Sequence, residues 1–154
     1  MAAGSPTQGF ARILVPTDFS AGSSRAWAVA RPLARGFSSE LILLHVLVET
    51  PLYSEGPFSM KRARSVFEAA RVWAEKTLGE WTAVATAEGL SARWLTRSGT
   101  PHAEIIDVAQ AEQAGLIVIA THGRTGLDRA LLGSVADRVI RTARCPVVTV
   151  RTTE

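Results

Sequence analysis

Two glycines and a serine in the C-terminal part of the chain stand at a spacing that could bind an anion. Gly123 follows the apolar run Leu116–Ile119, and Gly133 and Ser134 come after the nine residues 124–132. The apolar run has the length of a buried strand, and apolar residues recur at helical spacing around Ser134. The sequence therefore predicts a strand, a glycine-bearing loop and a helix whose first N–H groups are free to bind an anion.

Two side chains in this stretch suit a phosphate. The guanidinium of Arg124 offers several donors, and Ser134 at a helix start offers a hydroxyl together with a backbone N–H. Two well-known phosphate loops are excluded, because neither GxxxxGK followed by Ser or Thr nor GxGxxG occurs in the chain. Their absence argues against a P-loop kinase and against a hydride-transfer enzyme.

The stretch resembles the nucleotide loop of the universal stress protein family. That loop reads glycine, two residues, glycine, nine residues, glycine and then serine or threonine. Gly123, Gly133 and Ser134 match the pattern, whereas Ala120 stands in the first glycine position. A methyl group there could crowd a phosphate, or could be tolerated if only the backbone N–H is used.

The resemblance covers residues 11–151 and includes the fragments ILVPTDFS, LLHV, LLGSVADRVI and CPVVTVR. It implies a five-stranded sheet in the order 3-2-1-4-5, a cytoplasmic homodimer and, in many members of the family, ATP at the carboxyl edge of the sheet. Other members bind no nucleotide. The site residues implied by the resemblance are Pro16, Thr17 and Asp18 beside the adenosine, Val46 at the adenine, and Ala120, His122, Gly123, Arg124, Gly133, Ser134 and Val135 around the phosphates.

Electrostatics restricts what Asp18 can do in such a site. A carboxylate beside a triphosphate is repelled, so Asp18 is expected to face ribose hydroxyls or a bridging Mg²⁺ ion. Arg124 would then balance the phosphate charge. A second interpretation stays open, in which Asp18 and Ser20 simply form a turn and a helix N-cap.

The phosphate-side residues also have structural alternatives. Gly133 and Ser134 fit close helix packing and a cap equally well. A hydrogen bond that orders the loop explains His122 as well as a ligand contact does.

These residues need a scaffold, and the apolar segments predict one. Strand-like runs at residues 11–15, 41–48, 91–97, 116–119 and 146–151 alternate with helical patterns. The alternation predicts an α/β fold, a doubly wound parallel sheet with right-handed crossovers and helices on both faces. Ligands bind such sheets beyond the carboxyl ends of the strands, where the strand order reverses. If the strands that end at Pro16 and Ala120 are neighbours there, their loops face one crevice.

Composition fits one domain without a nucleic-acid or membrane partner. The chain has 154 residues and is 47% hydrophobic. Residues 1–10 are expected to form a flexible N-terminal tail and residues 11–151 the universal stress protein domain. The 17 basic and 14 acidic residues are interspersed, which argues against a nucleic-acid surface. We expect a cytoplasmic protein, because no signal-peptide core or membrane-length apolar run occurs and Cys145 is a lone, packed cysteine.

Local signals predict where helices begin and end. Ser20 should cap a helix that stops at Gly36, and Pro101 should begin a helix that stops at Gly115. Residues 49–60 are predicted to form a loop before a long helix. The apolar positions assigned to that long helix are Val66, Ala70, Trp73, Trp81 and Val84.

The histidines and the single cysteine do not predict a metal site. The three histidines and single cysteine lack metal-ligand spacing, so no protein-built metal site is expected, and Mg²⁺ would arrive with ATP. His45 lies in an apolar strand and is expected to be a hydrogen-bonded core residue.

The last strand follows Pro146 and should form a sheet edge, where residues 147–151 would pair with a second copy.

Three functions remain open from the sequence. The first is an ATP-binding regulatory module, in which nucleotide changes what the dimer surface presents. The second is a nucleotide-free homodimeric interaction protein of the same fold, which Ala120 favours. The third is an enzyme, and at most weak ATP hydrolysis is expected because no base with an activated nucleophile is evident near the loop.

Overall fold

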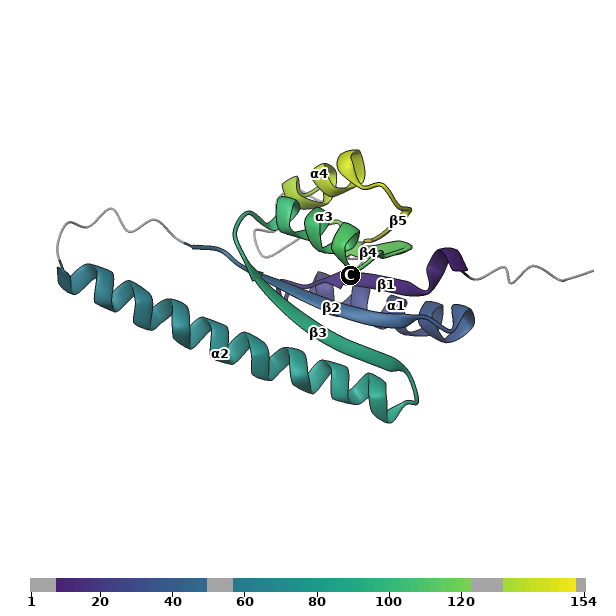
Figure 1. The fold of residues 1–154 in the computed structure, drawn as a ribbon, viewed down its shortest axis with the longest axis horizontal. Helices are drawn as coiled ribbons and strands as arrows, with labels where there is room; N and C mark the ends of the chain where they lie inside the picture. Colours follow the sequence, from purple (N-terminus) through teal and green to yellow (C-terminus); the bar gives the residue numbers. More distant parts are fainter. Residues whose placement is uncertain (1–7, 50–56, 123–131, 152–154) are drawn as a thin grey trace, which may run out of the picture.

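The computed structural model describes residues 8–49, 57–122 and 132–151. These residues contain a parallel sheet in the order β3-β2-β1-β4-β5, with a helix between each strand and the next along the chain (Figure 1). The predicted order 3-2-1-4-5 is therefore confirmed. The elements in chain order are β1 (Arg12–Pro16), α1 (Ala21–Phe37), β2 (Glu40–Leu47), α2 (Pro57–Ala87), β3 (Ser91–Ser98), α3 (Pro101–Ala111), β4 (Leu116–Ala120), α4 (Ser134–Thr142) and β5 (Val147–Val150).

The three inner strands are buried on both faces. Successive side chains of a strand point to opposite faces, and in β1 Ile13 and Val15 join one core cluster whereas Leu14 joins the other. The alternation repeats along β2 and β4, whose apolar runs are almost fully buried. Continuous apolar runs of this kind are what a parallel sheet covered by helices requires.

Each face of the sheet is covered by two helices. Side chains of α1 and α2 complete the first cluster, and side chains of α3 and α4 complete the second. Figure 1 shows α3 and α4 on one side of the sheet and α2 on the other. The prediction of a doubly wound α/β fold with helices on both faces is confirmed.

The start of α1 follows the prediction and its end does not. The Ser23 amide donates to Ser20 Oγ at 3.2 Å, so Ser20 is the N-cap. The helix continues past Gly36 to Phe37, and Ser38 takes the left-handed conformation with φ 54°. Gly36 is therefore helical, and the predicted stop at this residue is wrong.

The long helix α2 differs most from the sequence pattern. It begins at Pro57, so the predicted loop does not extend to residue 60. Its buried residues are Ala74, Leu78, Thr82 and Ala85, while Val66 and Val84 are exposed. Ala70 and Trp73 are exposed as well, and of the predicted apolar positions only Trp81 packs against the core cluster.

Gly115 has a different role from the predicted helix stop. Helix α3 already ends at Ala111, and Gln113 turns the chain with φ 53°. A Cβ on Gly115 would lie 1.5 Å from the Gly9 carbonyl oxygen, because residues 8–10 form a short 3-10 helix that packs here. The ring of Phe10 in this helix lies 4.9 Å from the ring of Phe37, tilted by 44°, although the sequence assigned residues 8–10 to the tail.

Candidate functional site

The order of the sheet reverses between β1 and β4. These strands pair in parallel with Ile13 beside Leu116 and Leu14 beside Ile117. Chain order then runs outward from β1 to β2 and β3 on one side, and from β4 to β5 on the other. The loops after Pro16 and after Ala120 consequently leave the same edge of the sheet at the switch point, where ligands bind folds of this class.

Hydrogen bonds fold the loop after β1 onto the start of α1. Asp18 Oδ1 accepts from the Ser20 amide at 3.0 Å and from the Ser23 hydroxyl at 3.0 Å. Thr17 Oγ1 accepts from the Phe19 amide at 3.0 Å and donates to Ser23 Oγ at 3.0 Å. Ser23 is buried, so the carboxylate of Asp18 is held against the body of the protein by its own loop.

Strand β2 supplies further support for this loop. The Thr17 amide donates to the Leu44 carbonyl at 2.8 Å, and His45 Nδ1 lies 2.8 Å from the Thr17 carbonyl oxygen. A carbonyl oxygen can only accept, so Nδ1 of His45 carries a proton. The expected hydrogen bond of His45 is confirmed, but its side chain is half-buried and lies outside both core clusters.

The exit of β4 contacts the start of α4 directly. The Gly133 amide donates to the Thr121 carbonyl at 2.7 Å, and the Thr121 amide donates to the Val150 carbonyl at 3.0 Å. A Cβ on Gly133 would stand 2.8 Å from Thr121 oxygen. Glycine is therefore required at this position by backbone packing, which is the structural alternative that the sequence left open.

The N-terminus of α4 still offers donors. The first helical bond runs from the Asp137 amide to the Gly133 carbonyl at 2.9 Å. The preceding amides of Ser134, Val135 and Ala136 lie in the first turn, and among the described residues no side chain caps it. Such amides and the helix dipole attract an anion, and Ser134 is exposed to receive one.

The other predicted site residues differ in their surroundings. Ala120 packs against the core cluster beneath α1, so the structure accounts for its methyl group by packing. His122 shares a 2.9 Å hydrogen bond with Thr121 Oγ1, and its Nε2 is buried without a partner among the described residues. Val46 is half-buried on β2. Gly123 and Arg124 lie outside the described residues.

Sequence reasoning missed three residues that shape this edge. Ser23 and Thr121 are buried polar residues that hold the two loops. Ser23 had a signal, since it stands three residues after the N-cap where capping partners occur. Phe19 has φ 62°, which no pattern predicts because bulky residues rarely adopt positive φ.

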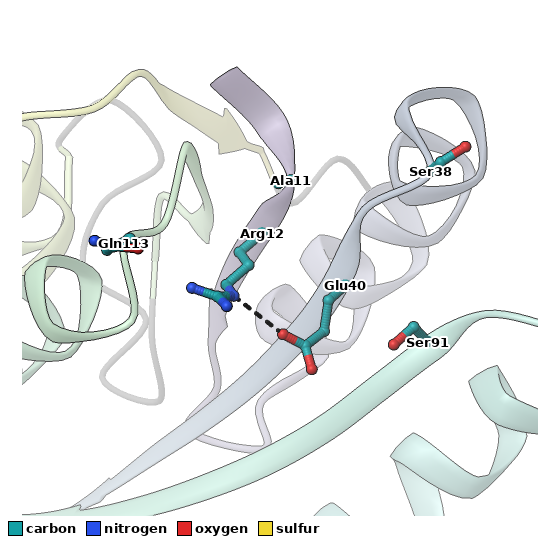
Figure 2. Close-up of a pocket in the computed structure, with 6 residues that line it drawn as sticks. All are labelled: Ala11, Arg12, Ser38, Glu40, Ser91 and Gln113. Carbon is teal, nitrogen blue, oxygen red and sulfur yellow. Dashed lines mark ion pairs between the residues drawn. The ribbon is translucent and has the colours of Figure 1, made fainter. Parts of the chain in front are cut away.

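A hollow of about 550 Å³ opens at the opposite, amino edge of the sheet. Figure 2 shows Arg12 pointing toward Glu40 across this hollow, with Nε 3.3 Å from Oε2. Arg93 donates to Glu40 at 3.0 Å and also pairs with Glu112. The Arg93 hydrogen bond lowers the pKa of Glu112. Because these opposite charges are paired, we interpret them as structural ion pairs that join the starts of β1, β2 and β3 to the end of α3. The lining residues are Ala11, Arg12, Ser38, Glu40, Ser91 and Gln113.

The described residues contain neither a cluster of metal ligands nor a membrane-spanning helix. No three His, Cys, Asp or Glu side chains gather where they could hold a metal ion. No helix in this part of the chain is both long and apolar enough to cross a bilayer.

Known proteins resemble the chain over nearly its full length. The family model described as the universal stress protein family matches residues 9–151. Universal stress protein MJ0531 of Methanocaldococcus jannaschii is 34% identical over 145 residues, which cover 92% of this chain and 82% of the relative. The structure of hypothetical protein MJ0577, from the same organism, has a TM-score of 0.84 at 27% identity and covers 94% of this chain and 98% of that one. A crystal structure of a universal stress protein in complex with cAMP has a TM-score of 0.66 at 25% identity, with 94% and 98% coverage.

Proposed function

The chain belongs to the universal stress protein family, and from that premise we propose that it is a stress-response regulatory module that binds an adenine nucleotide, ATP with Mg²⁺ by preference. The observation that carries the proposal is the adjacency of β1 and β4 in the order 3-2-1-4-5. It brings the Asp18 loop and the N-terminus of α4 to one edge of the sheet. A carboxylate for hydroxyl donors and a helix terminus for phosphates are the two groups that a nucleotide needs.

In this proposal the nucleotide spans the switch point. Asp18 accepts from the ribose hydroxyls, and the backbone at Val46 contacts the adenine. The amides at the start of α4 and the Ser134 hydroxyl hold phosphate oxygens. The other assignments, of Pro16, Thr17, Ala120, His122, Gly123, Arg124, Gly133 and Val135, rest on the family resemblance. The family member solved with cAMP supports an adenine nucleotide as the ligand class.

The proposed output is binding, with at most weak hydrolysis of ATP. A hydrolytic base must be free to take a proton from water. Asp18 Oδ1 instead accepts two hydrogen bonds from its own loop, which favours a positioning role over a basic one. We assign no catalytic residue.

We further propose a cytoplasmic homodimer that pairs through β5 and the following Arg151. β5 is the edge strand beside β4, and an edge strand has one row of backbone groups available to a second chain. Nucleotide binding would then change the surface that the dimer presents to a protein partner.

Calorimetric titration of the parent, Asp18→Asn and Ser134→Ala with ATP, ADP, AMP and cAMP tests the site. Asparagine keeps an acceptor for the Ser20 amide but removes the charge, so Asp18→Asn should weaken nucleotide binding about tenfold. Ser134→Ala should weaken ATP binding about threefold to tenfold by loss of one hydrogen bond. Ser91→Ala, an exposed serine at the amino edge, is the matched control and should bind as the parent does. Equal affinity in all four proteins would refute the site.

The second candidate is a nucleotide-free interaction dimer of the same fold. The packing of Gly133 on Thr121 and the internal hydrogen bonds of Asp18 favour it, because both residues have structural roles without a ligand. Absence of binding heat for every nucleotide would select this candidate.

A further inference from the structure

Phe19 adopts a backbone conformation that its side chain disfavours. Its φ is 62°, in the left-handed region where a bulky residue costs free energy unless its surroundings hold it. The residue lies directly after Asp18. Both adjoining amides are hydrogen-bonded within the loop, that of Phe19 to Thr17 Oγ1 and that of Ser20 to Asp18 Oδ1, each at 3.0 Å. Relaxation of φ at Phe19 would disrupt these two bonds.

Three rings surround the Phe19 side chain and account for the strained conformation. Its centroid lies 4.6 Å from the His45 ring, 4.8 Å from Trp73 and 5.9 Å from Trp81. The two tryptophan contacts are edge-to-face, an arrangement that aromatic pairs prefer. His45 belongs to β2 and both tryptophans to α2, so three elements meet at one loop residue.

Trp73 lies where α2 begins to separate from the body. From Met60 to Trp73 no side chain is buried, and Ala74 is the first buried residue after Met60. Figure 1 shows this half of α2 extending beyond the neighbouring strands. Contact with Phe19 therefore secures the helix near the point where its packing against the sheet starts.

We infer that Phe19 is a positioning residue that couples the Asp18 loop to α2. The aromatic contacts hold Phe19 at positive φ, and this conformation directs Asp18 Oδ1 toward the start of α1. Displacement of Trp73 loosens the loop, and a ligand that fixes the loop restrains α2. The link to ligand binding rests on the proposed function, whereas the link between loop and helix does not.

Hydrogen exchange of the full-length protein without nucleotide tests the coupling itself. The Phe19 and Ser20 amides report loop closure because their acceptors lie in the loop. Trp73→Ala should speed their exchange about fivefold to tenfold through loss of one aromatic pair. Val72→Ala is the matched control, since Val72 is 55% exposed and Trp73 51% exposed on the same turn. Equal loop exchange in the two variants overturns the inference.

Substitutions of Phe19 separate the ring from the backbone. Phe19→Tyr should keep parental exchange in the loop and in α2, whereas Phe19→Ala should speed exchange in both. Phe19→Gly accepts positive φ without strain but has no ring, and it should behave as Phe19→Ala does. Parental protection in Phe19→Gly would show that the ring contacts are dispensable and would overturn the inference.

Titration of the same variants with ATP tests whether the coupling between the Asp18 loop and α2 affects nucleotide binding. Trp73→Ala should weaken ATP binding to the extent that it lowers the fraction of molecules with a closed loop, and Phe19→Tyr should keep parental affinity. If the parent binds no nucleotide, the proposed function fails and the exchange measurements still decide the coupling. If the parent binds ATP and Trp73→Ala binds it equally well despite a loosened loop, the link to the site is wrong.

Discussion

Asp18 shows how one residue can satisfy both explanations of a sequence motif. Its Oδ1 accepts from the Ser20 amide and the Ser23 hydroxyl, as a turn before a helix cap requires. The same bonds orient the carboxylate at the switch-point edge of the sheet, where the proposed ribose contact lies. The hydrogen bonds establish the structural role of Asp18, and a variant that keeps the acceptor while removing the charge tests the proposed ligand role separately.

At the amino edge, the pairing of Glu112 with Arg93 predicts a pH effect on stability. Arg93 lowers the pKa of Glu112 below its ordinary value of 4.5. A carboxylate with a lowered folded-state pKa stabilises the protein above the unfolded pKa, and this contribution is lost as pH falls through the folded value. The free energy of unfolding of Glu112→Gln should thus approach that of the parent as pH falls from about 6 to about 3.

Urea unfolding of a double-mutant cycle measures this effect. Arg93→Gln, Glu112→Gln and the double variant give the coupling energy between the two side chains at each pH. The coupling should be favourable at neutral pH and should decline on acidification. A coupling that is constant over this range would contradict the assignment of the lowered pKa to Arg93.

At the scale of elements, burial explains which predictions succeeded. The strands were predictable because β1, β2 and β4 are covered on both faces, which demands continuous apolar runs. The buried face of α2 was not predictable, because the apolar residues Val66 and Val84 are exposed, whereas Ala74, Leu78 and Ala85 are buried. Helix α1 ends at Phe37, and the left-handed residue that follows it is Ser38, which a glycine signal at Gly36 does not report.

Gly79 in the middle of α2 offers a test of helix energetics. Helix α2 runs unbroken through this glycine, from Pro57 to Ala87. A Cβ at this position would lie 3.8 Å from Trp94 Nε1, an ordinary contact distance. Gly79→Ala should therefore raise the free energy of unfolding by about 1 kcal/mol, because alanine has the higher helix propensity.

Urea denaturation compares Gly79→Ala with two other glycine substitutions. Gly36→Ala is the control in an exposed helical position with nothing within 4 Å of the added Cβ, and it should be stabilising to a similar extent. Gly115→Ala should be destabilising, since its Cβ would overlap Gly9 oxygen. A loss of stability in Gly79→Ala would mean that α2 packs more closely on β3 than the structure indicates.

At the scale of the whole molecule, the sheet has β3 at one edge and β5 at the other. The Pro146 and Val150 carbonyls accept from β4. Because alternate residues of a parallel strand bond to opposite sides, the Thr149 amide points away from β4 toward the free edge. This geometry gives the proposed dimer a specific donor.

Thr149→Pro removes that donor and keeps the pairing with β4, because proline is tolerated on an edge strand when its missing N–H faces outward. If β5 pairs with a second copy, sedimentation should give about half the parental mass. Thr149→Ala keeps the amide and should keep the parental mass. A dimeric Thr149→Pro variant with parental secondary structure would place the interface elsewhere.

The site was predictable in outline and not in detail. Glycine spacing marked the loop after Ala120, and the strand order that the family resemblance implies placed it at the same edge of the sheet as the loop after Pro16. The positive φ of Phe19 and the contact of Gly133 with Thr121 could not be foreseen, because each depends on neighbours distant in sequence. Gly123 and Arg124 lie outside the described residues, so their assignment still rests on the family pattern.

The most direct test of nucleotide binding is to denature freshly purified protein and identify released small molecules by mass spectrometry, with ATP titration of the emptied protein as the second step of the same measurement. The account predicts an adenine nucleotide near one per chain, or saturable ATP binding that Asp18→Asn weakens. Protein that releases no nucleotide and gives no binding signal with ATP and Mg²⁺ would contradict the account and leave the interaction dimer as the function.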